Sequence, residues 1–235
     1  MNKSHRSYSG YKNYRNYSSY RHHKNKKVRR LFTVLCCAIC LSGFGQKAIS
    51  DTSRLRDGDL LFLVAPETNA ITAVTSGTQS LPIDHVGIFH LHDGKGMVLE
   101  ATYNGVVETP LADFGKGAAK VLVGRVRGKI DMVKSLANAH ALLGRPYDFL
   151  FLPENEEIYC SELVQLSFVF KDGSKVFAPI PMTFRDNNGD LLPYWQEFYA
   201  RRLSVVPDGF PGSNPGELSR RQNVRIKYEL RGIVR

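Results

Sequence analysis

The sequence predicts an α+β protein in which helices pack on a meandering antiparallel sheet. Short apolar runs of strand length follow one another between residues 60 and 127. Turn dipeptides such as Asp93-Gly94 separate successive runs, as they do in antiparallel hairpins. Apolar residues with helical spacing come later, mainly within 132–143 and 159–170. Strands followed by helices favour an α+β layout over a parallel sheet with alternating helices.

Each strand is indicated by β-branched and aromatic residues between turn signals. The predicted strands cover residues 60–64, 83–92, 97–102, 106–108, 120–127 and 224–234. Between the second and third strands, a two-residue turn at Asp93-Gly94 and a four-residue turn over 93–96 are both compatible with the sequence. The two-residue turn pairs Gly87 with Glu100, and this is the register that suits a contact between His85 and Glu100.

Helices are predicted from apolar spacing and from start and stop signals. The predicted helices cover residues 68–76, 132–143, 159–170 and 194–203. Thr68 or Asn69 is the expected N-cap of the first, Gly144 stops the second and Gly173 stops the third. Loop is predicted through Pro207, Pro211 and Pro215.

The formal net charge of +10 belongs to the first 30 residues. They hold 10 of the 32 Lys and Arg and no Asp or Glu, so the other 22 basic residues are matched by the 22 acidic ones. A basic chain suggests a nucleic-acid or anionic-surface partner, but a net-neutral body excludes that reading for residues 31–235. We expect residues 46–235 to form a single domain.

Residues 1–45 have the pattern of an export signal. Residues 1–30 are basic and Tyr-rich and are predicted to be disordered, and residues 31–45 form an uncharged apolar run that ends at Gly43-Phe44-Gly45. That run is shorter than the roughly 20 residues of a membrane-spanning helix. The signal is either cleaved before Gln46 or retained as an anchor. Tyrosines among cations can also stack on single-stranded nucleic acid, but a solvated leader explains them equally, and no nucleic-acid partner is expected for the mature chain.

Cys160 is the lone cysteine of the body, because Cys36, Cys37 and Cys40 all lie in the apolar run. The body therefore has neither an internal disulfide nor a cysteine-based zinc site. Cys160 opens a predicted helix, where unpaired amides and the helix dipole favour a thiolate, and its own amide can donate to an oxyanion. The alternative is a small buried apolar residue.

A cysteine nucleophile needs a base and a group that orients the base. The body contains four candidate bases, His85, His90, His92 and His140. Strand alternation places His85 and His90 on opposite faces, which argues against a metal or binding site that uses both together with His92. His140 falls within a predicted helix and is interpreted as a surface or structural histidine.

Glu100 is the candidate orienting group. Either hairpin register places it on the same face as His85, and the two-residue turn brings it within two positions along the ladder. A carboxylate among Val98, Leu99 and Ala101 requires a polar partner if it is buried. The alternative is a solvated edge-strand Glu.

Two pairs of motifs resemble a known family. They are Ile83-Asp84-His85-Val86-Gly87-Ile88-Phe89 with Val98-Leu99-Glu100-Ala101, and Gly144-Arg145-Pro146-Tyr147 with Tyr159-Cys160-Ser161-Glu162-Leu163-Val164. They resemble the histidine half and the cysteine half of NlpC-type, papain-fold cysteine peptidases. The cysteine half comes second here, as in the circularly permuted, YiiX-like branch, whose layout lecithin retinol acyltransferase shares. The resemblance covers about residues 55–170 and implies a permuted papain-like fold.

The resemblance also implies roles by position. Cys160 is the implied nucleophile, His85 the general base and then general acid, and Glu100 the group that orients the imidazole. Tyr147 matches a family tyrosine near the oxyanion or substrate. Tyr159 stands where ordinary members have Asp, and we include it as a second candidate contact to substrate or oxyanion. No metal or other cofactor is expected for this chemistry.

The predicted function is an exported cysteine peptidase or amidase of the periplasm or cell envelope. Family analogy points to peptide amides of peptidoglycan as substrates, with N-acyl amides also possible, and to membrane contact only through the export signal. One alternative is an acyltransferase or lipid-amide hydrolase of the same fold, which an apolar pocket built from Phe149, Leu150, Phe151 and Leu152 would favour. The other is a non-catalytic binding module. Residues 171–235, with Trp195, are expected to form a lid or pocket wall.

Overall fold

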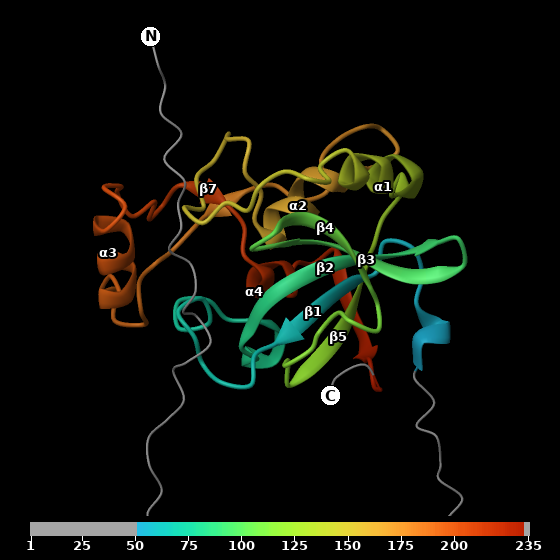
Figure 1. Ribbon diagram of the computed structural model, residues 1–235, viewed down its shortest axis with the longest axis horizontal. Helices are drawn as coiled ribbons and strands as arrows, with labels where there is room; N and C mark the ends of the chain where they lie inside the picture. Colours follow the sequence, from blue (N-terminus) through green and yellow to red (C-terminus); the bar gives the residue numbers. More distant parts are fainter. Residues whose placement is uncertain (1–50, 233–235) are drawn as a thin grey trace, which may run out of the picture. The chain divides into compact units, whose positions relative to one another are not determined.

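The computed structural model describes residues 51–232. The predicted basic segment over 1–30 and the apolar run over 31–45 lie outside the described residues. Within 51–232 the strands and helices form the predicted α+β arrangement, an antiparallel sheet covered by helices (Figure 1). No helix of this part of the chain combines the length and the apolar character that crossing a membrane requires.

The main sheet has six strands in the order β4-β3-β2-β1-β5-β8, and every neighbouring pair is antiparallel. Their bounds are β1 Leu60–Val64, β2 Ile83–His92, β3 Lys95–Thr102, β4 Gly105–Pro110, β5 Lys120–Val126 and β8 Val224–Glu229. All six predicted strands are therefore present; β3 and β4 are longer than predicted, and β8 ends at Glu229, with no strand over 230–232 where the prediction continued it. A separate two-stranded pair joins β6 Ile180–Pro181 to β7 Pro211–Gly212, so part of the segment predicted as loop is strand.

The β2–β3 hairpin has the two-residue turn. Asp93 and Gly94 both have positive φ, 50° and 74°, as a type I′ turn requires, and His92 pairs with Lys95. The ladder runs on to Ile88 opposite Leu99. This register places Glu100 one step further, opposite Gly87, as the two-residue turn predicts.

The two faces of the sheet bury separate apolar clusters. One face packs Leu60, Phe62, Ile88 and Leu99 against residues of the helices, including Leu163 and Leu218. The other face packs Leu61, Phe89, Val98 and Val123 against Leu111 and Phe114, which lie in the connection after β4. Because side chains alternate along each strand, one face of the sheet packs against the helices and the other against the loop that follows β4.

Four α-helices lie within residues 51–232: α1 Met132–His140, α2 Cys160–Ser167, α3 Pro193–Ala200 and α4 Pro215–Leu218. Short 3-10 turns occur at Asp51–Arg54 and Thr78–Ser80. Helix α1 continues into turns up to Gly144, where φ is 82°, and α3 continues into turns up to Leu203. α4 lies in the segment that was predicted as loop.

Two predicted helices differ from the structure. Residues 68–76 form no helix; hydrogen-bonded turns cover 70–74 alone. Asn69 Oδ1 accepts from the amides of Ile71 and Thr72 as a cap would, but β-branched residues follow and the turn does not propagate.

Helix α2 ends at Ser167, earlier than the predicted Phe170. Phe168 is extended (φ −78°, ψ 128°), and Val169 and Phe170 form bridges with Lys175 and Ile130. Aromatic and β-branched residues gain more from this pairing and burial than from continuing the helix.

A third apolar cluster is aromatic and lies beside the sheet. Its buried members are Tyr159, Met182, Phe184, Trp195 and Tyr199. Trp195 Nε1 donates to the carbonyl of Ala70 at 3.1 Å, and Tyr199 donates its hydroxyl to the carbonyl of Leu150 at 2.9 Å. These bonds tie α3 to two loops that are distant in sequence.

Candidate active site

Cys160 is the first residue of α2. Tyr159 precedes it as an extended N-cap, and the Tyr159 amide donates to Glu162 Oε2 at 3.4 Å. Cys160 is only 4% exposed, but it lines a pocket. Amides of the first helical turn have no partner within the helix, so they are available to donate to a substrate oxygen.

His85 lies on β2 and is held by Glu100 on β3. Its Nε2 is 2.7 Å from Glu100 Oε2. The same imidazole lies close enough to the Cys160 thiol for the two groups to interact. Because Nε2 faces the carboxylate, Nδ1 is the ring nitrogen left for the thiol. The structure therefore brings together the three residues for which the sequence implies the roles of nucleophile, base and orienting group.

The charges around His85 favour the imidazolium form. Burial alone would lower the pKa of His85, but hydrogen bonds and charge interactions with Cys160 and Glu100 outweigh burial and raise the pKa to about 10. An imidazolium between a thiolate and a carboxylate is consistent with this shift.

Packing holds the His85 ring in place. The ring lies 6.0 Å from the Phe114 ring, measured between centroids. A Cβ at Gly87 would come within 2.4 Å of Val98 Cγ1 and 3.1 Å of Phe114 Cε2, so only glycine lets these side chains close around the hairpin here. The β1–β2 ladder also shifts register between Leu63 and Val64, next to His85, and such irregularities often re-aim side chains at active sites.

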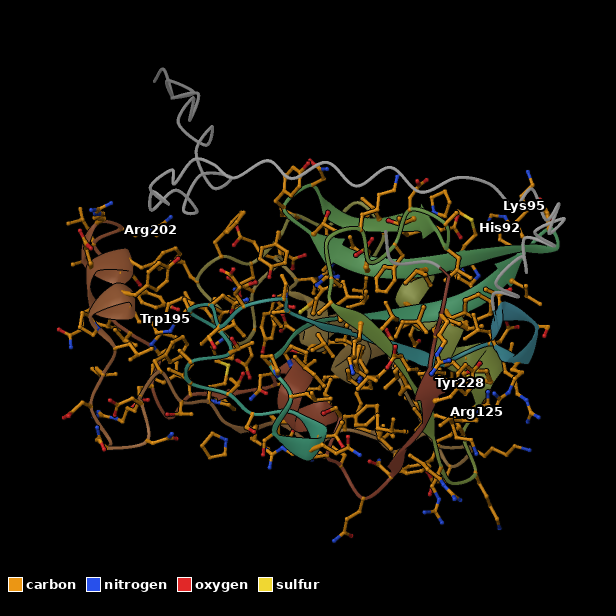
Figure 2. The ribbon with its side chains drawn as sticks, turned by 90° about the horizontal axis from the view of Figure 1, so that it is seen from below. His92, Lys95, Arg125, Trp195, Arg202 and Tyr228 are labelled. Atoms are coloured by element: carbon orange, nitrogen blue, oxygen red, sulfur yellow. The ribbon has the colours of Figure 1, made fainter. Side chains whose placement is uncertain are left out.

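The pocket beside Cys160 encloses about 490 Å³ of empty space and is partly open to solvent. Its apolar lining consists of Ile71, Val74, Tyr147, Phe151, Tyr159, Met182, Phe184, Trp195 and Pro215. Phe151 packs edge-to-face on Trp195. Trp195, a residue of α3, is thus a pocket wall as predicted, and Figure 2 labels it. Of the four apolar residues whose pocket would favour the acyltransferase alternative, Phe151 lines this one. Leu150 packs in the aromatic cluster, Phe149 lies against Tyr147, and Leu152 is not among the lining residues.

Tyr147 and Tyr159, the two candidate contacts to substrate or oxyanion, both line the pocket. The Tyr159 hydroxyl accepts from the Ser213 amide at 3.1 Å and lies 3.9 Å from Met182 Sδ. Burial raises the pKa of both phenols, so both stay neutral at physiological pH. Tyr159 fixes the start of α2 against β7, which leaves Tyr147 as the better candidate for contact with substrate.

Asp84 is a pocket residue that was not predicted from the sequence. Its carboxylate accepts from Asn69 Nδ2 at 2.7 Å, and burial raises its pKa. One signal in the sequence could have identified it. By strand alternation Asp84 shares a face with Val86 and Ile88, and these residues pack in the same cluster as Cys160.

The other three body histidines gather elsewhere. His90 and His92 lie at the far end of β2, and the His140 ring packs edge-to-face on His90 at 4.9 Å between centroids. Glu108 on β4 joins them. His85 is not part of this group, so the three-histidine site that alternation argued against is absent. A cluster with Glu108 and His140 was not anticipated, since their approach depends on the packing of α1.

Comparison with known proteins gives a family and a fold. The family model described as "Permuted papain-like amidase enzyme, YaeF/YiiX, C92 family" matches residues 54–218. The crystal structure of metalloprotein yiiX from Escherichia coli O157:H7 is similar, with a TM-score of 0.56 and 22% sequence identity. The alignment covers 74% of this chain and 97% of that one. No curated protein matches. At this identity the structural likeness establishes a shared fold.

Proposed function

Because the chain belongs to the permuted papain-like amidase family, we propose that it is a cysteine hydrolase that cleaves amide bonds through an acyl-thioester on Cys160. The observation that carries this proposal is the arrangement of His85, which hydrogen-bonds Glu100 and also interacts with Cys160. The family is that of a papain-like hydrolase, and the three side chains supply what a cysteine nucleophile requires.

The first half-reaction forms the acyl-enzyme. The Cys160 thiolate attacks the amide carbon, a C–S bond forms, and the carbonyl electron pair moves onto oxygen. Amides at the start of α2 donate to that oxyanion. The His85 imidazolium then gives its proton to the leaving nitrogen as the C–N bond breaks, and an amine departs.

The second half-reaction hydrolyses the thioester and regenerates the free enzyme. Neutral His85 takes a proton from water, the resulting hydroxide attacks the thioester carbon, and the C–S bond breaks with its electrons on sulfur. A carboxylic acid leaves, and the thiolate and imidazolium are restored. Glu100 holds the ring through Nε2 throughout. A different acceptor in place of water makes the same acyl-enzyme a transferase.

The predicted export signal supports an envelope location, where peptide amides of peptidoglycan are the first substrate class to consider. The pocket supports a second class. Several of its walls are aromatic, with Trp195 in edge contact with Phe151 and Phe184, and such walls can bury an apolar acyl chain. We therefore propose N-acyl amides as the second candidate, with the acyl group in the pocket.

A substrate panel tests the proposal. Muropeptides and N-acyl amino acids with acyl chains of graded length are incubated with the wild type and with Cys160→Ala, and free acid and amine are measured. The proposal predicts Cys160-dependent release of both products. Rates that rise with chain length support the acyl-pocket assignment, whereas cleavage of muropeptides alone contradicts it. If no substrate of the panel shows Cys160-dependent cleavage or transfer, the proposed hydrolase activity is contradicted.

A further inference from the structure

Glu108 lies at the centre of a cluster of histidines on the helical face of the sheet. His90 Nε2 is 2.8 Å from Glu108 Oε1, and His92 Nδ1 is 3.0 Å from the same oxygen. His140, the last residue of α1, completes the group from above the sheet. Among residues 51–232, His90, Glu108 and His140 are the group whose metal-ligating atoms all lie within 4.8 Å of one another.

His90 is the unusual member. It is 3% exposed, and its Nε2 is buried without a hydrogen bond, because Glu108 Oε1 is near but does not satisfy hydrogen-bond geometry. A buried ring nitrogen that lacks a hydrogen bond calls for a physical reason, and an ion is one such reason.

We propose that His90, Glu108 and His140 bind one divalent transition-metal ion of the Zn²⁺ type. Two imidazoles and one carboxylate form a donor set that such ions prefer. Ligands bound at about 2.1 Å in a tetrahedron lie about 3.4 Å apart, so a spread within 4.8 Å closes with small side-chain movements. His92 or a water molecule supplies the fourth ligand.

The position of the site indicates a structural role. His90 is five residues from His85 along β2, about 16 Å at the rise of a strand, and the two point to opposite faces. Figure 2 shows His92 at the hairpin end of the described chain and Trp195 of the pocket at the opposite end. The ion would join the end of α1 to β2 and β4, and α1 packs beside α2, which carries Cys160. The inference does not depend on the proposed hydrolase.

The catalytic trio is the competing metal site, because Cys160, His85 and Glu100 are also possible ligands. The test therefore uses full-length, untagged protein with Cys36, Cys37 and Cys40 replaced by Ser, stripped with a chelator. Zn²⁺ and Co²⁺ are titrated into this protein and into its His140→Ala, Glu108→Gln and Cys160→Ala variants. Stoichiometry, affinity and the metal-induced rise in Tm are measured, and circular dichroism checks folding.

We expect one ion per chain. The affinity should fall by at least ~100-fold in His140→Ala and Glu108→Gln and stay unchanged in Cys160→Ala. The benchmark is the loss of an outer-shell residue that only orients a ligand, which already costs about 10- to 100-fold in metal affinity. The metal-induced rise in Tm should be smaller in His140→Ala and Glu108→Gln than in the parent protein and in Cys160→Ala. No binding, or binding lost in Cys160→Ala but retained in His140→Ala, overturns the proposal.

X-ray absorption of the Co²⁺-loaded parent protein keeps the proposal testable if a variant does not fold. Only nitrogen and oxygen ligands are expected. A sulfur ligand overturns the assignment, since Cys160 is the thiol that remains.

Discussion

His85 Nε2 lies 2.7 Å from Glu100 Oε2, across the neighbouring strands β2 and β3. This contact follows from the two-residue turn at Asp93-Gly94, because a four-residue turn would move Glu100 from opposite Gly87 to opposite Phe89, two residues along the ladder. The turn therefore sets the register that brings Glu100 to His85 Nε2, which leaves Nδ1 for the thiol. Glu100 is a positioning residue that acts through His85.

Substitution of Glu100 should alter both the rate and its pH dependence. Glu100→Gln keeps a hydrogen-bond acceptor but removes the charge, and we expect kcat/KM at pH 7 to fall roughly 10-fold; Glu100→Ala removes both and should cost roughly 100-fold. The pKa of His85 should fall in both variants. A pH profile of kcat/KM for the wild type and both variants measures this, and a purely structural Glu100 would lower the rate without moving the alkaline limb.

The proposed activity should fall at high pH. His85 has a pKa raised to about 10, so the imidazolium that protonates the leaving amine persists below that value and is lost as the pH rises through it. We expect kcat/KM to decline with an apparent pKa near 10. A decline centred near 6.5, the ordinary histidine value, would show that Cys160 and Glu100 do not stabilise the charged ring.

Glu162 should make the protein less stable as the pH rises. Burial, reinforced by the charge of Asp148, raises the pKa of Glu162 to about 7. Between its ordinary value and about 7 the folded protein holds a proton that the unfolded chain has lost, so stability decreases across this window. Glu162→Gln should raise the free energy of unfolding by about 1–2 kcal/mol at pH 8 and have little effect at pH 5.

Urea unfolding at both pH values measures the effect of Glu162→Gln, with Glu156→Gln as the control. Glu156 is 87% exposed and pairs with Arg145 at the surface, so no pH-dependent gain is expected. Equal effects of Glu162→Gln at pH 5 and pH 8 would contradict the raised pKa.

Asp59 and Arg125 form a bidentate ion pair that anchors β1 to β5. Both guanidinium contacts measure 2.6 Å, and the Arg56 amide donates to the same carboxylate. Asp59 is buried, so Asp59→Asn leaves Arg125 without its counter-charge and should lower the free energy of unfolding by roughly 2–4 kcal/mol.

The matched control for Asp59→Asn is Glu229→Gln. It breaks the exposed pair with Lys120 across the same sheet and should change stability by less than about 0.5 kcal/mol. Similar losses in both variants, measured by chemical unfolding, would contradict the assignment of Asp59 as an anchor.

Much of the sheet and the proposed catalytic trio could be predicted because local signals agree with the fold. Gly94 permits the tight turn, period-two alternation assigns His85 and Glu100 to one face, and Cys160 follows an extended residue at a helix start. Where propensity and tertiary packing disagree, prediction failed. Phe168 joins the core as extended chain, and the turn after Asn69 does not become a helix.

The pocket wall and the histidine cluster depend on contacts between distant segments. Trp195 reaches the carbonyl of Ala70, and His140 meets His90 only because α1 ends over β2. Neither contact has a signature in the spacing of the sequence.

The most direct test of the central claim is the rate at which iodoacetamide alkylates Cys160 from pH 5 to pH 10. Mass spectrometry of the peptide that contains Cys160 separates it from the other cysteines, and His85→Ala serves as the comparison. If His85 activates Cys160, the wild-type thiol reacts well below pH 8.5, and His85→Ala moves the titration towards that ordinary value. A wild-type rate that follows a pKa near 8.5, unchanged in His85→Ala, would contradict the account.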